Sequence, residues 1–262
     1  MPRQNHAGLL DHRVDINMIE SFRTLFAPPR HFILLFAALW IGLTLAEKRS
    51  ERHGISKDTL NNITFYSILA YIIGGRLLFV FANLSAFTPS PLSIFSPNPD
   101  LFDPASGLIT MILVGMIYGQ RQKLPFWGTL DALTPLFATL AIGLHLSHVA
   151  AGTAFGSPTT LPWGIDLWNA TRHPTQIYEL IAALIIFGLL WFRKSDVPAG
   201  ILFLNFIALT AGARLLLEAF RGDSTLVFGG LRLAQIAAWA ILAAVLLVRE
   251  SMRQKKIEPV TL

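Results

Sequence analysis

Charged side chains interrupt several apolar stretches of this 262-residue chain, and their types could do chemistry. Arg214 and Glu218 lie four positions apart in one such stretch, so they share one face of a helix. Arg221 continues that face. An arginine held by a carboxylate suits a phosphate group, because its planar guanidinium donates two parallel hydrogen bonds. The alternative is a neutralised ion pair that bridges two helices.

Two histidines, His145 and His148, lie three positions apart near the end of another apolar stretch. Two imidazoles on one helical face can bind a metal ion, but no carboxylate lies close in the sequence as a third ligand, and we predict no metal. The alternatives are neutral histidines with satisfied hydrogen bonds, or a polar cluster that binds lipid headgroups or transfers protons. Imidazole suits proton transfer because it titrates near neutral pH.

Arg76 directly follows Gly74 and Gly75 inside a third apolar stretch. Small residues allow a neighbouring helix to approach closely, and this spacing predicts a helix–helix contact. We expect Arg76 to have a buried partner or a lipid phosphate. The alternative is a side chain that extends toward the membrane interface.

Gln176 and Glu179 share one face of a helix that we expect to begin near Pro174. The preceding loop, residues 151–173, is long. A loop of this length could cover a site at the outer face of a membrane.

The composition requires a membrane to accommodate these stretches. The chain is 53% hydrophobic and 14% charged, whereas soluble domains carry about 25% charged residues. A bilayer-spanning helix needs roughly 20 mainly apolar residues. We therefore predict an all-α, polytopic protein with seven transmembrane helices, at 31–46, 63–83, 105–119, 127–150, 175–192, 199–219 and 227–248.

The distribution of Lys and Arg predicts the orientation of these helices. Twelve lie on the side that holds the C-terminus: Lys48, Arg49, Arg52, Lys57, Arg121, Lys123, Arg193, Lys194, Arg249, Arg253, Lys255 and Lys256. Six lie on the opposite side. By the positive-inside rule the C-terminus is cytoplasmic and the N-terminus outside. The net charge of +5 then faces anionic lipid, and no nucleic acid is needed to explain it.

The chain reads as one membrane domain, residues 31–248, after an extracytoplasmic or interfacial segment at 1–30 and before a cytoplasmic tail at 249–262. The first segment lacks the apolar core and cleavage site of a signal peptide. It is either a mobile polar tail or a short interfacial helix, whose apolar stripe would be Val14, Ile16, Ile19, Phe22 and Phe26. The absence of cysteine excludes disulfides and thiolate chemistry.

Several motifs occur in a characteristic order: GGRLLFV at 74–80, Asp131 with Pro135, GxPTxLPWG at 156–164, RHPTQIYE at 172–179, RxxxExxR at 214–221, and Gln235. Over residues 30–248 this pattern resembles the prolipoprotein diacylglyceryl transferases. The resemblance implies transfer of a diacylglyceryl group from phosphatidylglycerol to the lipobox cysteine of preprolipoproteins. It also implies a seven-helix enzyme of the bacterial cytoplasmic membrane that contacts membrane lipid and signal peptides and needs no cofactor.

Some positions depart from the family pattern. His145 aligns with an essential arginine, His148 with an asparagine, and Thr153 with a glutamate; Ala105 replaces a catalytic histidine. Phe32 and Thr210 stand where the family has tyrosines, while Gly156 is retained.

Three interpretations follow from these departures. The chain is a transferase in which histidines replace the lost groups, or an enzyme with another acceptor or lipid, or a non-catalytic lipid-binding relative. An unrelated transporter or channel would need a polar path, whereas the polar residues here gather toward the outer half. We predict the first, with catalytic residues Arg214, His145, His148 and Glu218 and substrate-binding residues Arg76, Gly156, Arg172, His173, Gln176 and Tyr178. His145, when protonated, would contact phosphate, and His148 would act as the base.

Overall fold

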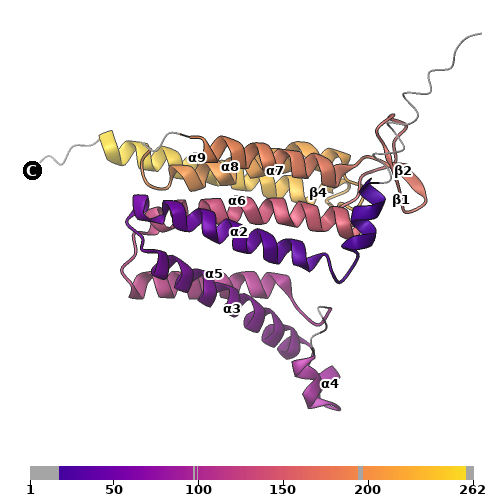
Figure 1. The fold of residues 1–262 in the computed structure, drawn as a ribbon, viewed down its shortest axis with the longest axis horizontal. Coiled ribbons are helices and arrows are strands. Elements are labelled where there is room, and N and C mark those ends of the chain that lie inside the picture. Colours follow the sequence, from indigo (N-terminus) through magenta and orange to yellow (C-terminus); the bar gives the residue numbers. More distant parts are fainter. Residues whose placement is uncertain (1–17, 97, 99, 194–196, 258–262) are drawn as a thin grey trace, which may run out of the picture. The chain divides into compact units, whose positions relative to one another are not determined.

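The computed structural model describes residues 18–96, 98, 100–193 and 197–257. Every predicted apolar stretch falls on a long helix: α2 (Phe32–Ser50), α3 (Lys57–Ala82), α5 (Pro104–Arg121), α6 (Phe126–Ala151), α7 (Thr175–Trp191), α8 (Ile201–Leu217) and α9 (Leu233–Ile257) (Figure 1). The short helices are α4 (Leu84–Phe87) and the 3-10 helices η1 (Glu51–His53), η2 (Pro91–Phe95) and η3 (Glu218–Phe220). The strands are β1 (Ile165–Leu167), β2 (Ala170–Arg172), β3 (Leu226–Val227) and β4 (Leu231–Arg232).

Among the described residues, four helical segments are long and apolar enough to cross a membrane: Lys57–Ala82, Phe126–Ala151, Ile201–Phe220 and Leu233–Gln254. The helix Thr175–Trp191 is apolar but shorter. Large apolar side chains cover the outer faces of the helices; Trp239 is 63% exposed and Leu247 is 72% exposed. Apolar surface on this scale marks a membrane or interaction surface. These helices therefore belong to a membrane protein.

The chain forms two compact units. The first comprises residues 1–46 and 134–262, and the second residues 47–133. In the first unit α6, α7 and α8 share a core, and α8 packs against both α7 and α9. That core is built from Ala138, Ile186, Leu190, Leu202 and Phe206. Half of the residues in the most apolar segment of α6 are buried (50%), compared with 11% in that of α9. Helix α6 is therefore the more deeply buried of these two helices.

In the second unit α3 packs along α5. A Cβ added to Gly74 would overlap the side chain of Thr110, whose hydroxyl donates to the carbonyl of Ala70 at 3.0 Å. The small-residue helix contact predicted there is confirmed. Asp103 caps the start of α5 by accepting hydrogen bonds from the backbone N–H groups of Ala105 and Ser106.

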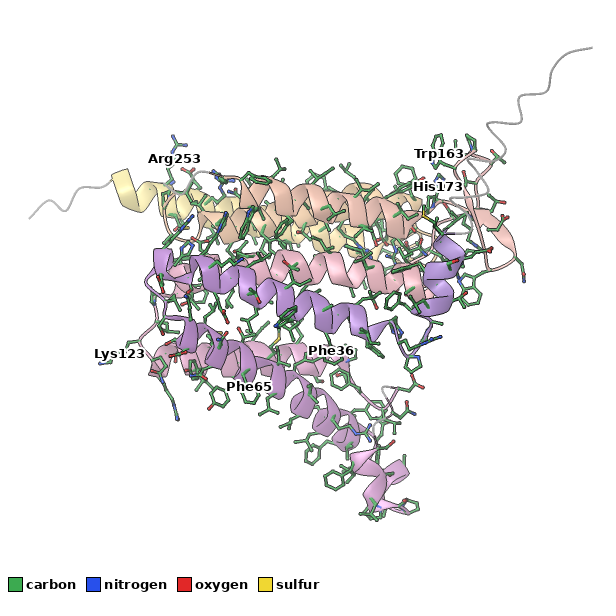
Figure 2. All side chains as sticks on the ribbon, in the orientation of Figure 1. Phe36, Phe65, Lys123, Trp163, His173 and Arg253 are labelled. Carbon is green, nitrogen blue, oxygen red and sulfur yellow. The ribbon has the colours of Figure 1, made fainter. Side chains whose placement is uncertain are left out.

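Two short antiparallel hairpins extend from the helices of the first unit. Strand β1 pairs with β2 in the register Ile165↔Arg172, within the long loop before α7. Strands β3 and β4 pair just before α9. The predicted start of the last stretch at residue 227 is therefore wrong: Gly229 and Gly230 adopt positive φ angles and turn the chain back, and α9 begins at Leu233. Within this unit, Trp163 and His173 lie at the hairpin end and Arg253 at the other end (Figure 2).

The described part of the N-terminal segment includes a helix at residues 18–25, which carries Ile19 and Phe22. The helical alternative is confirmed there, and its place at a membrane interface stays a prediction. Val14, Ile16, Lys194 and residues 258–262 lie outside the described residues.

Candidate functional site

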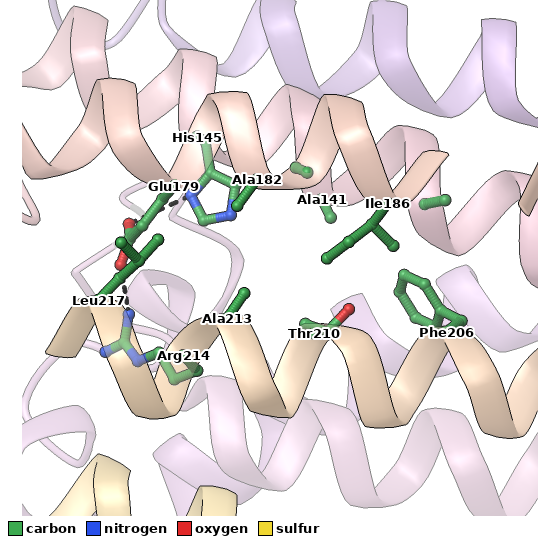
Figure 3. Close-up of a pocket in the computed structure, with 12 residues that line it drawn as sticks. Ala141, His145, Glu179, Ala182, Ile186, Phe206, Thr210, Ala213, Arg214 and Leu217 are labelled. Atoms are coloured by element: carbon green, nitrogen blue, oxygen red, sulfur yellow. Dashed lines mark hydrogen bonds and ion pairs between the residues drawn. The ribbon is translucent and has the colours of Figure 1, made fainter. Parts of the chain in front are cut away.

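Glu179, from the second turn of α7, is the centre of a buried charged cluster. One carboxylate oxygen, Oε1, accepts hydrogen bonds from Arg214 at 2.7 Å and from Arg221 at 3.1 Å. The other, Oε2, lies 3.2 Å from Nδ1 of His145 (Figure 3). The Glu179 side chain is only 4% exposed. A carboxylate this deeply buried needs such partners, because burial of an unpaired charge is costly.

Arg214 and Glu218 form the predicted pair. Nη2 of Arg214 lies 2.9 Å from Oε2 of Glu218. Helix α8 ends at Leu217 and continues as the tighter η3, after which Arg221 turns back to Glu179. Arg221 also lies 2.8 Å from Asp223. Two guanidinium groups are thus shared among three carboxylates, which keeps the local charge nearly balanced.

The two histidines come from the last turns of α6. Their ring centroids are 5.9 Å apart, at an interplanar angle of 72°. His145 and Arg214 both contact the carboxylate of Glu179, at 3.2 Å and 2.7 Å. The structure therefore brings His145 and Arg214, both predicted as catalytic residues, to the same carboxylate.

Arg232 fixes the backbone beneath this cluster. Its guanidinium donates to the carbonyl oxygens of Glu218 at 2.6 Å and Arg221 at 2.7 Å, and to the hydroxyl of Ser224 at 2.6 Å. The sequence placed Arg221 on the face of Arg214 and Glu218, but it assigned no role to Arg232. An arginine inside the predicted stretch 227–248 was the available signal for Arg232. The central position of Glu179 had no local signal, because its partners lie 34 and more residues away.

Two residues predicted to bind substrate hold the long loop instead of pointing outward. Arg172 donates to the carbonyls of Leu167 at 3.0 Å and Gly156 at 3.2 Å. Gln176 is 2% exposed and donates to the carbonyl of Thr153 at 2.9 Å. Both side chains shape the loop around the start of α7, and direct contact with a substrate stays a prediction.

The other predicted substrate-binding residues of the first unit, Gly156, His173 and Tyr178, lie at its hairpin end. A Cβ on Gly156 would overlap the carbonyl oxygen of His173, so only glycine fits there. The ring of His173 lies 5.2 Å from that of Phe220. The hydroxyl of Tyr178 accepts a hydrogen bond from the indole N–H of Trp163 at 2.7 Å. These contacts place the residues, while their substrate roles stay predictions.

Arg76 belongs to the second unit and has its partners there. Its Nε donates to the carbonyl of Ile94 at 2.8 Å, Nη2 to that of Ser93 at 2.7 Å, and Nη1 to that of Leu101. Arg76 thus has protein partners, which are half-buried backbone carbonyls, and its position relative to a membrane interface stays a prediction. A phosphate contact for Arg76, and its place in the cavity of Arg214, stay predictions.

A cavity opens between α6, α7 and α8 of the first unit. The cavity is small and partly open to its surroundings. His145, Glu179 and Arg214 form its polar end (Figure 3). The rest of its wall is mainly small and apolar, from Ala138, Ala141, Ala182, Ala183, Ile186, Phe206, Thr210, Ala213 and Leu217. The cavity thus joins a charged end to an apolar wall.

Known proteins of similar sequence identify the family of this site. The family model described as prolipoprotein diacylglyceryl transferase matches residues 30–249. The phosphatidylglycerol–prolipoprotein diacylglyceryl transferase of Clostridioides difficile (strain 630) is 32% identical, over 78% of this chain and 82% of the relative. The enzyme of the same name from Desulfotalea psychrophila (strain LSv54 / DSM 12343) is 33% identical, over 68% of this chain and 70% of the relative. That from Trichormus variabilis (strain ATCC 29413 / PCC 7937) is 29% identical, over 79% of this chain and 79% of the relative. With its motifs and its buried Arg214–Glu179–Arg221 cluster, the chain belongs to the prolipoprotein diacylglyceryl transferase family.

Proposed function

We propose that this protein transfers the diacylglyceryl group of phosphatidylglycerol to the cysteine thiol of a preprolipoprotein lipobox. The observation that carries this proposal is the convergence of Arg214, Glu179 and His145 at the polar end of an apolar cavity. A phospholipid has the matching shape, with an anionic phosphate attached to apolar chains. The names of the similar enzymes specify the same donor and acceptor.

The reaction makes one bond and breaks one. The cysteine sulfur attacks the glycerol carbon that carries the phosphate, a carbon–sulfur bond forms, and the carbon–oxygen bond to phosphate breaks. Glycerol phosphate leaves with the electron pair, and the thiol proton passes to a base. The site must therefore supply a proton acceptor and a cationic group for the phosphate.

Arg214 is the cation that we assign to the phosphate. Its side chain is 36% exposed and lines the cavity, whereas Arg221 is 10% exposed and does not line it. Glu179 and Glu218 hold the Arg214 guanidinium from two sides, at 2.7 Å and 2.9 Å. These carboxylates orient the planar group before a lipid arrives, which lowers the cost of binding the transition state.

His145 is the base that the geometry favours. It lines the cavity, and its Nδ1 faces Oε2 of Glu179. A carboxylate at one imidazole nitrogen fixes the tautomer in which the other nitrogen accepts a proton. His148, whose ring centroid lies 5.9 Å from that of His145, is the second candidate. The sequence led us to expect His148 as the base and His145 as a phosphate contact, whereas this assignment makes His145 the base and Arg214 the phosphate contact.

The apolar wall of the cavity suits one acyl chain of the donor. Alanines from all three helices, among them Ala141, Ala182 and Ala213, leave open the space that larger side chains would occupy. We assign substrate contacts near the start of α7 to Gly156, Arg172, His173, Gln176 and Tyr178. In this proposal seven helices cross the bacterial cytoplasmic membrane, with the N-terminus outside and the C-terminus inside.

A transfer assay tests the proposal. The protein in detergent is incubated with phosphatidylglycerol and a lipobox peptide, and mass spectrometry searches for a diacylglyceryl adduct on the cysteine. We expect an adduct with the wild type and none with Arg214→Ala. His145→Gln should abolish transfer more completely than His148→Gln if His145 is the base. No adduct from folded protein that still binds the lipid would contradict the proposed acceptor and favour a relative that modifies another thiol or only binds lipid.

The acyl-chain assignment has a matched pair of variants. Ala182→Leu places a larger side chain in the cavity and should raise KM for long-chain donors more than for short-chain donors. Ala237→Leu adds the same side chain on an exposed face of α9 and serves as the control. Equal effects of the two variants would contradict the assignment.

A further inference from the structure

Three side chains able to bind a metal ion meet at the end of α6. They are His145 and His148 on that helix and Glu179 on α7, and one potential ligand atom from each lies within 4.8 Å of the others. The sequence alone offered only the two histidines, since the carboxylate lies 31 and more positions further along the chain. The fold supplies the third ligand that sequence spacing did not show.

The ligand types favour a divalent transition metal ion. Two imidazoles and one carboxylate form a common three-residue zinc site with one position left for another ligand. Zinc–ligand bonds of about 2.0–2.1 Å place ligand atoms roughly 3.4 Å apart in a tetrahedral site. The contact of 3.2 Å between Nδ1 of His145 and Oε2 of Glu179 already meets that spacing. The ligand atom of His148 lies within 4.8 Å of the others, so it has to approach by at most about 1.4 Å, which side-chain rotation can provide.

The two oxygens of the Glu179 carboxylate differ in their closest partners. Oε1 accepts hydrogen bonds from Arg214 at 2.7 Å and from Arg221 at 3.1 Å. Oε2 faces His145 at 3.2 Å and accepts only a longer contact of 3.5 Å from Arg221. A metal ion at Oε2 therefore leaves the two shorter arginine contacts in place and competes only with the longer one. Glu218 and Asp223 also neutralise the two guanidiniums, which reduces their repulsion of a cation. The nearby charge of Arg232, which donates to backbone carbonyls, opposes binding and keeps the affinity below that of a dedicated zinc site.

A buried nitrogen in the cluster has no hydrogen-bond partner. Nδ1 of His148 is buried and, among the described residues, no protein atom forms a hydrogen bond with it. A buried polar atom without a partner is destabilising by about 1–3 kcal/mol. A bound metal ion removes this penalty when it coordinates that nitrogen.

We propose that His145, His148 and Glu179 bind one zinc ion or a similar divalent transition metal ion. Binding uses the lone pairs of both imidazoles, so neither can accept the proton of a thiol while the ion is bound. Zinc should therefore inhibit the transfer reaction reversibly. That consequence rests on the proposed function, whereas metal binding itself does not.

The test measures binding without any lipid substrate. The full chain, purified in detergent without a polyhistidine tag and stripped of metal with EDTA, is dialysed against Zn²⁺, and bound zinc per chain is measured by mass spectrometry. We expect one zinc per chain in the wild type. In His148→Gln the affinity should fall by at least about 100-fold, since even residues outside the ligand shell contribute about 10–100-fold. His53→Gln, which changes a histidine of the second unit, is the matched control and should bind as the wild type does.

Thermal unfolding and gel filtration establish that each variant is folded. Folded wild-type protein without zinc, or equal affinity in the wild type and in His148→Gln, would overturn the proposal. Cobalt substitution gives a second measurement, because a four-coordinate site has strong visible absorption that His148→Gln should lose. Absent transfer activity with intact zinc binding would contradict the proposed function alone.

Discussion

Arg76 and Arg214 both lie inside apolar helices, yet their surroundings differ. Arg76 donates to three backbone carbonyls, those of Ser93, Ile94 and Leu101. Arg214 contacts two carboxylates, Glu179 and Glu218, and more than a third of its side chain remains exposed at a cavity. The first arrangement uses the donors of an arginine to fix a loop. The second neutralises its charge and leaves one side open to an anion.

An ionisable residue in a membrane helix is often taken as the mark of a functional site. From this comparison we infer that the partners of an arginine decide between a structural and a functional role. Carbonyl oxygens satisfy the hydrogen bonds of a guanidinium and leave it in one position. Carboxylates orient it while a ligand phosphate can still approach its exposed side.

The largest effect is expected when the carboxylate shared by the cluster loses its charge. Glu179→Gln leaves the buried Arg221 without its central partner, and loss of one partner of a buried ion pair is destabilising by about 3–5 kcal/mol. The melting temperature in detergent should fall clearly and transfer should be lost. Glu179→Asp, which keeps the charge, should lose less stability. An unchanged melting temperature in Glu179→Gln would contradict the distinction drawn between Arg214, which has carboxylate partners, and Arg76, which has carbonyl partners.

Arg214→Lys should reduce kcat without a comparable loss of stability. Lysine keeps the positive charge but cannot donate two parallel hydrogen bonds to a phosphate. Loss of one aligned donor to a transition state reduces kcat by about 10²–10³-fold. Transfer kinetics with phosphatidylglycerol measure this effect. Arg253→Lys, an exposed change at the other end of the unit, is the control; full activity of Arg214→Lys would refute the phosphate role.

Arg76→Lys should reduce the stability of the protein more than it reduces kcat. Lysine cannot reach three carbonyls at once, and each buried acceptor left without a donor is destabilising by about 1–3 kcal/mol. We expect a lower melting temperature and a smaller kinetic change than in Arg214→Lys. A normal melting temperature together with lost lipid binding would show that Arg76 is a phosphate ligand after all.

The smallest effect concerns the helix start beside the loop of Arg76. The side-chain hydroxyl of Ser106, followed by its backbone N–H and that of Ala105, lowers the pKa of Asp103 below its usual 3.8. A lowered folded-state pKa contributes stability above pH 3.8 that is lost as the pH falls through the folded value. Asp103→Asn should therefore lower the melting temperature at neutral pH but not in strong acid. A pH-independent difference would assign the effect to shape instead of charge.

Hydrophobic patterning located the helices because it is a local property of the chain. The stretch 127–150 became α6 (Phe126–Ala151), and 175–192 became α7 (Thr175–Trp191). It misplaced the start of α9, where two glycines with positive φ angles form a hairpin inside an apolar run. Backbone turns of this kind leave little trace in hydropathy.

The site was predictable only in part for a related reason. The Arg214–Glu218 pair follows from helical spacing, and it was found. The contacts of Glu179 with His145 and Arg221 join residues 34 and 42 positions apart, and no periodicity in the sequence reports such a distance. The carbonyls around Arg76 are backbone atoms of a loop, whose identity does not depend on side-chain type.

The brevity of α7 has a consequence for the lipid around it. Its 17 residues extend about 26 Å at 1.5 Å per residue, less than the roughly 30 Å of a hydrocarbon core. In the proposed topology α7 crosses the bilayer, and thinning of the adjacent leaflet is one way to accommodate a helix this short. Thinning would bring the headgroup layer closer to Glu179, in the second turn of that helix. The proposed donor phospholipid would then reach Arg214 by lateral diffusion, without first leaving its leaflet.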